Sequence, residues 1–175
     1  KDINIKFIHI STDYVFDGTN HVPYQETDEP NPQSVYGATK LAGENAIQEI
    51  NPANTIVIRT SWVYSKYGNN FVKTMLRLGS ERDQLGVIVD QIGTPTYASD
   101  LAKAILEILP NVQNKNVEVY HYSNEGVCSW YDFAKAIFEI KDIEVKVNSI
   151  ETYQYPTAAE RPSYSVLNKS KIKQA

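Results

Sequence analysis

Apolar and polar residues in the first sixty positions form two short strand-like runs with one helical stretch between them. The runs Lys6–Ser11 and "TIVIRTSW" (55–62) are rich in apolar and β-branched residues, which is typical of buried strands. A polar segment (17–33) with several prolines separates the first run from a helical pattern that starts near Ser34 and ends near Asn51. We expect the apolar side of this helix at Ala38, Leu41, Ala42 and Ala46. This order is that of a βαβ crossover and predicts a parallel sheet.

The rest of the chain continues the alternation of strand-like and helical patterns, but less regularly. Helical periodicity recurs over 70–79, 101–109 and 130–140, and Ser99 or Asp100 is a candidate N-cap of the second helix. Strand-like patterns cover 86–90, 117–123 and 145–150. The pattern therefore predicts one α/β unit whose later part mixes sheet elements with a smaller lobe rich in loops.

Composition narrows the function classes. The 175 residues are 42% hydrophobic and 22% charged, and no run approaches the ~18 apolar residues of a membrane span. A net charge of −4 with scattered basic residues argues against nucleic-acid binding. The single cysteine, Cys128, cannot form an internal disulfide, and this favours a cytoplasmic setting. The three histidines lack metal-ligand spacing, so no metal site is predicted.

The start of the chain is unusual. The sequence opens at Lys1, its only methionine is Met75, and it enters a strand-like run almost at once. We therefore expect the sequence to be a portion of a longer protein, and we expect this portion to begin just before a strand.

Two Tyr-x-x-x-Lys pairs occur, Tyr36 with Lys40 and Tyr131 with Lys135. About one such pair is expected by chance in this composition, so the motif alone proves little. Context favours the first pair, because Thr12 stands where the preceding strand gives way to a loop. Ligands of parallel α/β sheets bind at the carboxyl ends of the strands.

The chemistry explains the residue types. A free phenol has a pKa near ~10, and a neighbouring ammonium group favours the phenolate. Tyr36 could then donate a proton while Thr12 holds a substrate carbonyl that accepts a hydride from a nicotinamide. The same residues also fit a structural role, with Tyr36 packed beside the loop and Lys40 solvated.

Six motifs carry a family resemblance. They are "STDYVFDG", "YGATKLAGE", "RTSWVY", "GNNFVKTMLRL", "DQIGTPTYASDLA" and "ERPSYSVLNKSK". Together, and in this order, the motifs resemble the dTDP-4-dehydrorhamnose reductases, an extended branch of the short-chain dehydrogenase/reductases. The resemblance runs through nearly the whole chain.

The resemblance implies NAD(P)H-dependent reduction of the C4 keto group of dTDP-4-dehydro-6-deoxy-L-mannose to dTDP-L-rhamnose, a precursor of cell-surface polysaccharide. Thr12 matches the catalytic hydroxyl and Tyr36 the proton donor, while Lys40 matches the residue that makes the tyrosine a better acid and binds the nicotinamide ribose. Ser61 matches a position near the nicotinamide. The positions that match substrate contacts are Thr12, Asp13, Tyr14, Trp62 and Arg161. Trp62 also fits a plain packing role. Some family members are described with Mg²⁺, but no residue here can be assigned to it.

The resemblance also implies a domain division. Residues 1–64 would be the C-terminal part of an NAD(P)-binding Rossmann domain, and 65–175 mainly a small mixed α/β substrate-binding lobe, with about 91–123 returning to the sheet. The chain contains no Gly-rich turn of the kind that cradles a dinucleotide pyrophosphate. We therefore expect this chain alone to bind NADH or NADPH weakly and not to turn over. The preference between the two cofactors and a homodimeric state are left open.

Two alternatives compete with the reductase. A sugar-nucleotide epimerase of the same superfamily would use the same tyrosine and lysine but retain its cofactor, whereas Asp13-Tyr14 after Thr12 disfavours a dehydratase. A non-catalytic protein similar to the regulatory β-subunit of methionine adenosyltransferase would use the fold to bind a partner enzyme. The joint presence of Thr12, Tyr36 and Lys40 favours catalysis.

Overall fold

A three-stranded parallel sheet forms the centre of the first of two lobes. The computed structural model describes residues 5–157 and 159–175, so the first four residues of the run that opens at Lys1 lie outside it. The strands β1 (Phe7–Thr12), β2 (Thr55–Thr60) and β7 (Glu118–Tyr122) stand in the order β1-β2-β7. Every residue of β2 is buried, as expected for a central strand.

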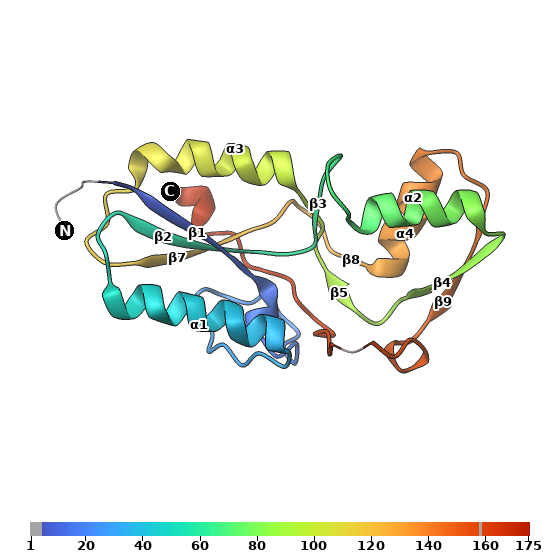
Figure 1. Cartoon of the computed structure of the whole chain (residues 1–175), viewed down its shortest axis with the longest axis horizontal. Helices are drawn as coiled ribbons and strands as arrows, with labels where there is room; N and C mark the ends of the chain where they lie inside the picture. The colour runs from blue at the N-terminus through green and yellow to red at the C-terminus, as the bar shows by residue number, and fades with distance from the viewer. Residues whose placement is uncertain (1–4, 158) are drawn as a thin grey trace.

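Two helices cover opposite faces of this sheet (Figure 1). Helix α1 (Val35–Ile50) connects β1 to β2, and α3 (Ala98–Ile108) precedes β7. The α3 face is apolar, because Leu101 and Ile108 pack with Ile56 and Ile58 of β2. Since the register pairs Thr12 with Thr60, β1 and β2 end side by side at one edge, where ligands of parallel sheets bind.

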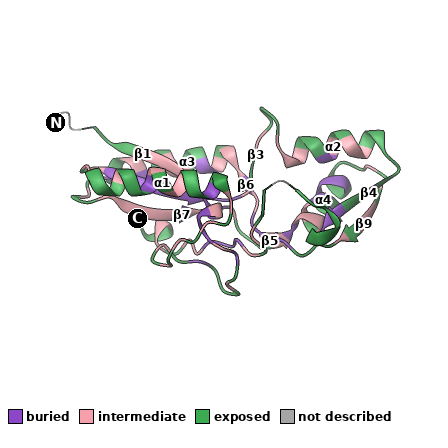
Figure 2. Ribbon diagram, turned by 60° about the horizontal axis from the view of Figure 1, so that its bottom comes forward, coloured by how far each residue is buried: buried purple, intermediate pink, exposed green. Residues whose placement is uncertain are grey.

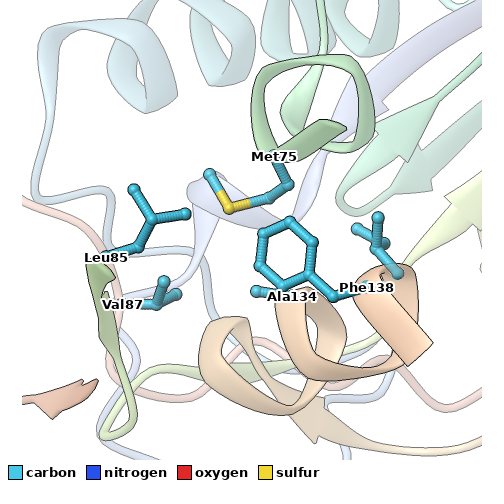
Figure 3. Packing of buried hydrophobic residues seen from close by; sticks show 6 residues of the cluster. Met75, Leu85, Val87, Ala134 and Phe138 are labelled. Carbon is cyan, nitrogen blue, oxygen red and sulfur yellow. The ribbon is translucent and has the colours of Figure 1, made fainter. Parts of the chain in front are cut away.

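The second lobe holds its own apolar core. Helices α2 (Phe71–Glu81) and α4 (Trp130–Ile140) pack beside a parallel pair of strands, β4 (Gln84–Ile88) and β9 (Lys146–Ile150). Figure 3 shows Met75 of α2 and Phe138 of α4 meeting Leu85 and Val87 of β4. Burial of the apolar side chains in this cluster stabilises the packing of the two helices against the strands of the second lobe.

Short strand pairs join the two halves. The strand β3 (Val63–Tyr64) pairs with β6 (Thr96–Tyr97), and β5 (Ile92–Gly93) pairs with β8 (Cys128–Ser129). Short 3-10 turns complete the fold at Asp13–Val15, Leu109–Asn111, Thr152–Gln154 and Ile172–Gln174. Among the helices in the described parts of the chain, none is long and apolar enough to cross a membrane.

The α/β fold and its parallel sheet confirm the prediction from the sequence, but two local details are wrong. The predicted apolar side of α1 is largely exposed at Ala38, Ala42 and Ala46, and the helix buries Gly37 and Glu44 instead. In Figure 2 much of α1 has the colour of exposed residues. Helix α3 begins without a side-chain cap, because its N-cap residue is Tyr97. Asp100 instead accepts a hydrogen bond from Asn124 at 2.8 Å.

Candidate functional site

A cavity of about 670 Å³ opens at the carboxyl ends of β1 and β2. Its walls come from the end of β1, the first turns of α1, the segment after β2, the start of α4 and a late loop. The site residues predicted from the sequence that line it are Thr12, Asp13, Tyr14, Tyr36, Lys40, Trp62 and Arg161. The fold thus brings together residues that are up to 149 positions apart.

The end of β1 forms a tight polar turn. The Thr12 hydroxyl donates to Asp13 Oδ1 at 2.9 Å and accepts from the Tyr14 N–H at 3.2 Å. Asp13 is 1% exposed. Burial raises the pKa of Asp13 to about 6, and hydrogen bonds from the Ser165 and Thr12 hydroxyls oppose this shift.

Helix α1 presents the tyrosine and the lysine to the cavity. Its N-cap, Ser34, accepts from the Gly37 N–H at 3.1 Å and fixes where the helix starts. The Lys40 ammonium donates to the Ile10 carbonyl of β1 at 2.6 Å. Tyr36 is 54% exposed, so its phenol can exchange protons with solvent.

Tyr14 stands between the turn and the helix. Its ring makes an edge contact with the ring of Tyr36, with centroids 5.7 Å apart. Burial raises the pKa of Tyr14 to about 12, and the nearby Asp13 carboxylate adds to the shift. Tyr14 is therefore a neutral hydroxyl at physiological pH and can serve as a hydrogen-bond donor.

Two stacked indoles form the opposite wall. The rings of Trp62 and Trp130 lie 3.5 Å apart and nearly parallel. Trp62 adopts a left-handed backbone conformation with φ of 47°, which is costly for a bulky residue. A Cβ at Gly93 would lie 2.6 Å from the Trp62 ring, so only glycine leaves room for it. This packing aims the indole at the cavity.

A late loop brings Arg161 to the same place. Gly18, with φ of 81°, packs directly against Pro162, and the Ser163 hydroxyl donates to the Gly18 carbonyl at 2.9 Å. Arg161 and Trp130 also border a second cavity of about 410 Å³ in the second lobe. Most of the other residues around it are apolar, and its lining includes Phe71, Met75, Leu78, Leu85, Val87 and Ile88. The two cavities therefore meet at one guanidinium group and one indole.

Ser61 and the second Tyr-Lys pair lie elsewhere. The Ser61 hydroxyl is buried and donates to the Thr94 carbonyl at 2.7 Å, and Ser61 does not line the main cavity. Tyr131 packs against the core of the second lobe, and Lys135 is exposed. The second pair therefore has no part in the cavity.

Trp130 lines the main cavity but is absent from the site residues predicted from the sequence. The available signal was the serine before it, because Ser129 and Asp132 form a capping box that fixes the start of α4 at the cavity. Within residues 5–157 and 159–175, no group of three or more His, Cys, Asp or Glu side chains could hold a metal ion. The described residues therefore give no support for a Mg²⁺ site.

Comparisons with known proteins agree with one another. The family model described as RmlD substrate binding domain matches residues 1–175. A dTDP-4-dehydrorhamnose reductase from Aggregatibacter actinomycetemcomitans is 45% identical over 98% of this chain and 61% of its own length. The chain thus spans about 60% of the length of this relative.

Two solved structures are similar across nearly the whole chain. The crystal structure of a dTDP-4-dehydrorhamnose reductase from Clostridium acetobutylicum superimposes with a TM-score of 0.90 at 47% identity, over 97% of this chain and 59% of that one. The Bacillus anthracis dTDP-4-dehydrorhamnose reductase in complex with NADP gives 0.90 at 44% identity with the same coverage. Both likenesses confirm the resemblance drawn from the six motifs.

Proposed function

Because the chain belongs to the RmlD substrate binding domain family, we propose that it carries the proton-transfer and sugar-nucleotide sites of an NAD(P)H-dependent reductase. The reaction is reduction of dTDP-4-dehydro-6-deoxy-L-mannose at C4 to dTDP-L-rhamnose. The observation that carries the proposal is the meeting of Thr12, Tyr36 and Lys40 at one cavity. The names of the relatives supply the substrate.

The placement of Thr12, Tyr36 and Lys40 at one cavity supports the following proton-transfer step. Bound NAD(P)H supplies the hydride that adds to C4. The Thr12 hydroxyl turns from Asp13 to the substrate carbonyl oxygen and keeps its bond from the Tyr14 N–H. Tyr36 gives its phenolic proton to that oxygen, Lys40 stabilises the phenolate, and solvent returns the proton to the exposed Tyr36.

The residues present fit the nicotinamide end of the cofactor, whereas the chain has no Gly-rich turn for its pyrophosphate. An ammonium group has three donors, and Lys40 uses one of them on the Ile10 carbonyl, so a ribose hydroxyl can be held beside Tyr36. A hydroxyl contact from Ser61 would require its bond to Thr94 to break, so any contribution of Ser61 comes through its backbone. We propose NAD(P)H as cofactor without a preference between its two forms.

The two cavities suit the two ends of a nucleotide sugar. The sugar would lie in the larger cavity against Asp13, Tyr14 and Trp62, and the base in the apolar second cavity. Arg161, which borders both, would bind the diphosphate between them. In this assignment 1–64 belong to the Rossmann part, 65–175 are mainly the substrate lobe, and about 91–123 return to the sheet. We propose a cytoplasmic location, which is compatible with the biosynthetic relatives.

Nucleotide binding can be tested on the chain itself. In calorimetric titrations, Arg161→Met should weaken binding of dTDP about tenfold, because a charge-assisted contact to phosphate is lost. The matched control is Arg77→Met on the exposed side of α2, which should leave binding unchanged. Thymidine lacks the diphosphate and should bind both variants alike. Equal loss for dTDP and thymidine would contradict the role of Arg161, and micromolar binding of NADPH would contradict the weak cofactor binding expected of the chain alone.

The reaction can be tested in a chimera in which this chain replaces the matched residues of the Bacillus anthracis reductase. We expect one NADPH to be oxidised for each dTDP-4-dehydro-6-deoxy-L-mannose consumed. An epimerase would change the sugar without net oxidation of NADPH. A folded chimera that binds NADPH and dTDP but neither oxidises cofactor nor alters the sugar would favour the regulatory alternative.

A further inference from the structure

A fully buried ion pair connects α1 to the central strand. Glu44 is 0% exposed and Arg59 of β2 is 3% exposed. Arg59 Nη2 lies 2.7 Å from Glu44 Oε2, and Arg59 Nε is 3.1 Å from both carboxylate oxygens. Removing two charges from water is costly, and a buried pair without a function is often no more stable than an apolar one.

Helix α1 has few apolar contacts to fix its rotation. Besides Glu44 it buries only Gly37, where a Cβ would collide with the Tyr14 carbonyl oxygen, and its alanines are exposed. Leu41 contributes a partly buried apolar contact. A glycine contact and one leucine would by themselves let the helix turn about its axis. Two polar contacts oppose that rotation: the bond from the Lys40 ammonium group to the Ile10 carbonyl, and the forked bond from the Arg59 guanidinium group to the Glu44 carboxylate, which joins two fully buried side chains.

The helix repeat places the pair in line with the site. Tyr36, Lys40 and Glu44 follow one another at intervals of four residues, so they lie along one face of α1. Any rotation that moves Glu44 away from Arg59 also turns the phenol of Tyr36 and the ammonium group of Lys40 away from the end of β1.

Arg59 fixes the turn at the end of β1 as well. Its guanidinium group lies over the ring of Phe16, 5.1 Å from the centroid. Phe16 follows the turn that carries Asp13 and Tyr14, and it stacks on Tyr24 with centroids 4.2 Å apart. One buried arginine therefore contacts the helix that holds Tyr36 and the residue that ends the Thr12 turn.

We infer that Glu44 and Arg59 are positioning residues, which set the rotation of α1 and so place Tyr36 and Lys40 against Thr12 and Tyr14. The inference rests on the proposed function only for what the positioned groups do. The geometry of the pair and its effect on the two tyrosine rings can be measured without a reaction.

The key variant replaces the pair by apolar residues, Glu44→Leu with Arg59→Met, in the full chain. Such replacements often retain stability, so the double variant should fold even where Glu44→Gln alone, which leaves Arg59 buried and unpaired, unfolds at lower denaturant concentration. The matched control is Arg77→Met with Glu81→Leu, which removes an exposed ion pair with the same 2.7 Å separation.

The readout is the placement of Tyr36. In the wild type and the control, nuclear Overhauser contacts between the rings of Tyr14 and Tyr36 should be present. In the apolar double variant these contacts should be lost, and amides of α1 should exchange at least about tenfold faster while those of β2 stay protected. A double variant with wild-type ring contacts and wild-type exchange in α1 would overturn the inference.

Turnover in the chimera separates this inference from the proposed function. The apolar double variant should lower kcat about tenfold or more with little change in dTDP binding, and restoring both charged residues should recover it. If the parent chimera has no reductase activity, the proposed function fails, while the ring contacts and the amide exchange still decide whether the pair sets the rotation of α1.

Discussion

Helices α1 and α4 carry the same Tyr-x-x-x-Lys spacing and both begin at a serine cap, yet they are held in different ways. Helix α4 buries Ala134, Ile137 and Phe138 in the core of the second lobe. Helix α1 buries a glycine and a glutamate and leaves its alanines exposed. A helix that is fixed by apolar packing can therefore pack its tyrosine against the core, whereas a helix that is fixed by polar contacts leaves its tyrosine open to a cavity.

The largest effect should come from the packed helix. Phe138 is 4% exposed, and Phe138→Ala should lower the free energy of unfolding by about 3–5 kcal/mol through lost burial and a cavity. The matched change on α1, Ile50→Ala, removes a side chain that is 77% exposed and should cost less than about 0.5 kcal/mol. Urea unfolding measures both changes, and similar losses would contradict the contrast between the helices.

Activity should show the reverse order. Tyr36→Phe removes the proposed proton donor and should lower turnover in the chimera by about two orders of magnitude or more. Tyr131→Phe, at the equivalent position of α4, should leave turnover within about twofold, because Tyr131 packs in the second lobe. Initial rates of NADPH oxidation decide this, and unchanged turnover in Tyr36→Phe would exclude Tyr36 as the donor.

The acids beside the two helices should respond to pH with opposite signs. Burial raises the pKa of Asp13 from 3.8 to about 6, so its contribution to stability is full below 3.8 and is lost as the pH rises through about 6. Asp13→Asn should therefore raise the free energy of unfolding at pH ~8 by up to ~3 kcal/mol and change it little near pH ~3.5.

Asp132 provides the opposite case. Its hydrogen bond from the Ser129 side chain lowers its pKa below 3.8, so its contribution is present above that value and is lost as the pH falls. Asp132→Asn should therefore destabilise the chain at neutral pH and lose this effect in acid. Denaturant titrations across the pH range test both signs, and a stabilising Asp132→Asn at neutral pH would contradict this assignment.

The smallest effect distinguishes the two caps. Ser129 accepts from the Asp132 N–H, and the Asp132 carboxylate accepts from the backbone of Ser129, whereas Ser34 makes the single cap bond to the Gly37 N–H. Ser129→Ala should cost ~1 kcal/mol and Ser34→Ala somewhat less. Urea unfolding of both variants gives the order, and a larger loss at Ser34 would show that α1 depends more on its cap than the contacts suggest.

Local signals in the sequence located most elements and several of the residues that line the main cavity. Strand patterns followed by a polar turn placed Thr12 at the end of β1, and spacing placed Tyr36 and Lys40 on one helix. These inferences succeed because each depends on neighbours within a few residues. The resemblance then added Trp62 and Arg161, which no periodicity identifies.

The failures concern contacts made across the chain. The sequence pattern predicts the alanine stripe of α1 as its buried side, but the helix buries the carboxylate of Glu44, whose partner Arg59 lies 15 residues later on a strand. Trp130 reaches the cavity because Gly93 and Trp62 form a surface that its ring can stack on. Neither partner follows from spacing, since tertiary contacts decide which face of an element is covered.

The stacked pair of indoles makes the protein its own optical probe. Trp62 and Trp130 are the two tryptophans of the chain, one from each side of the join between the lobes. With ring centroids 3.5 Å apart their excited states couple, so the tryptophan emission of the whole protein reports on a single place. A ligand that enters the cavity, or a small separation of the lobes, changes this signal without any label.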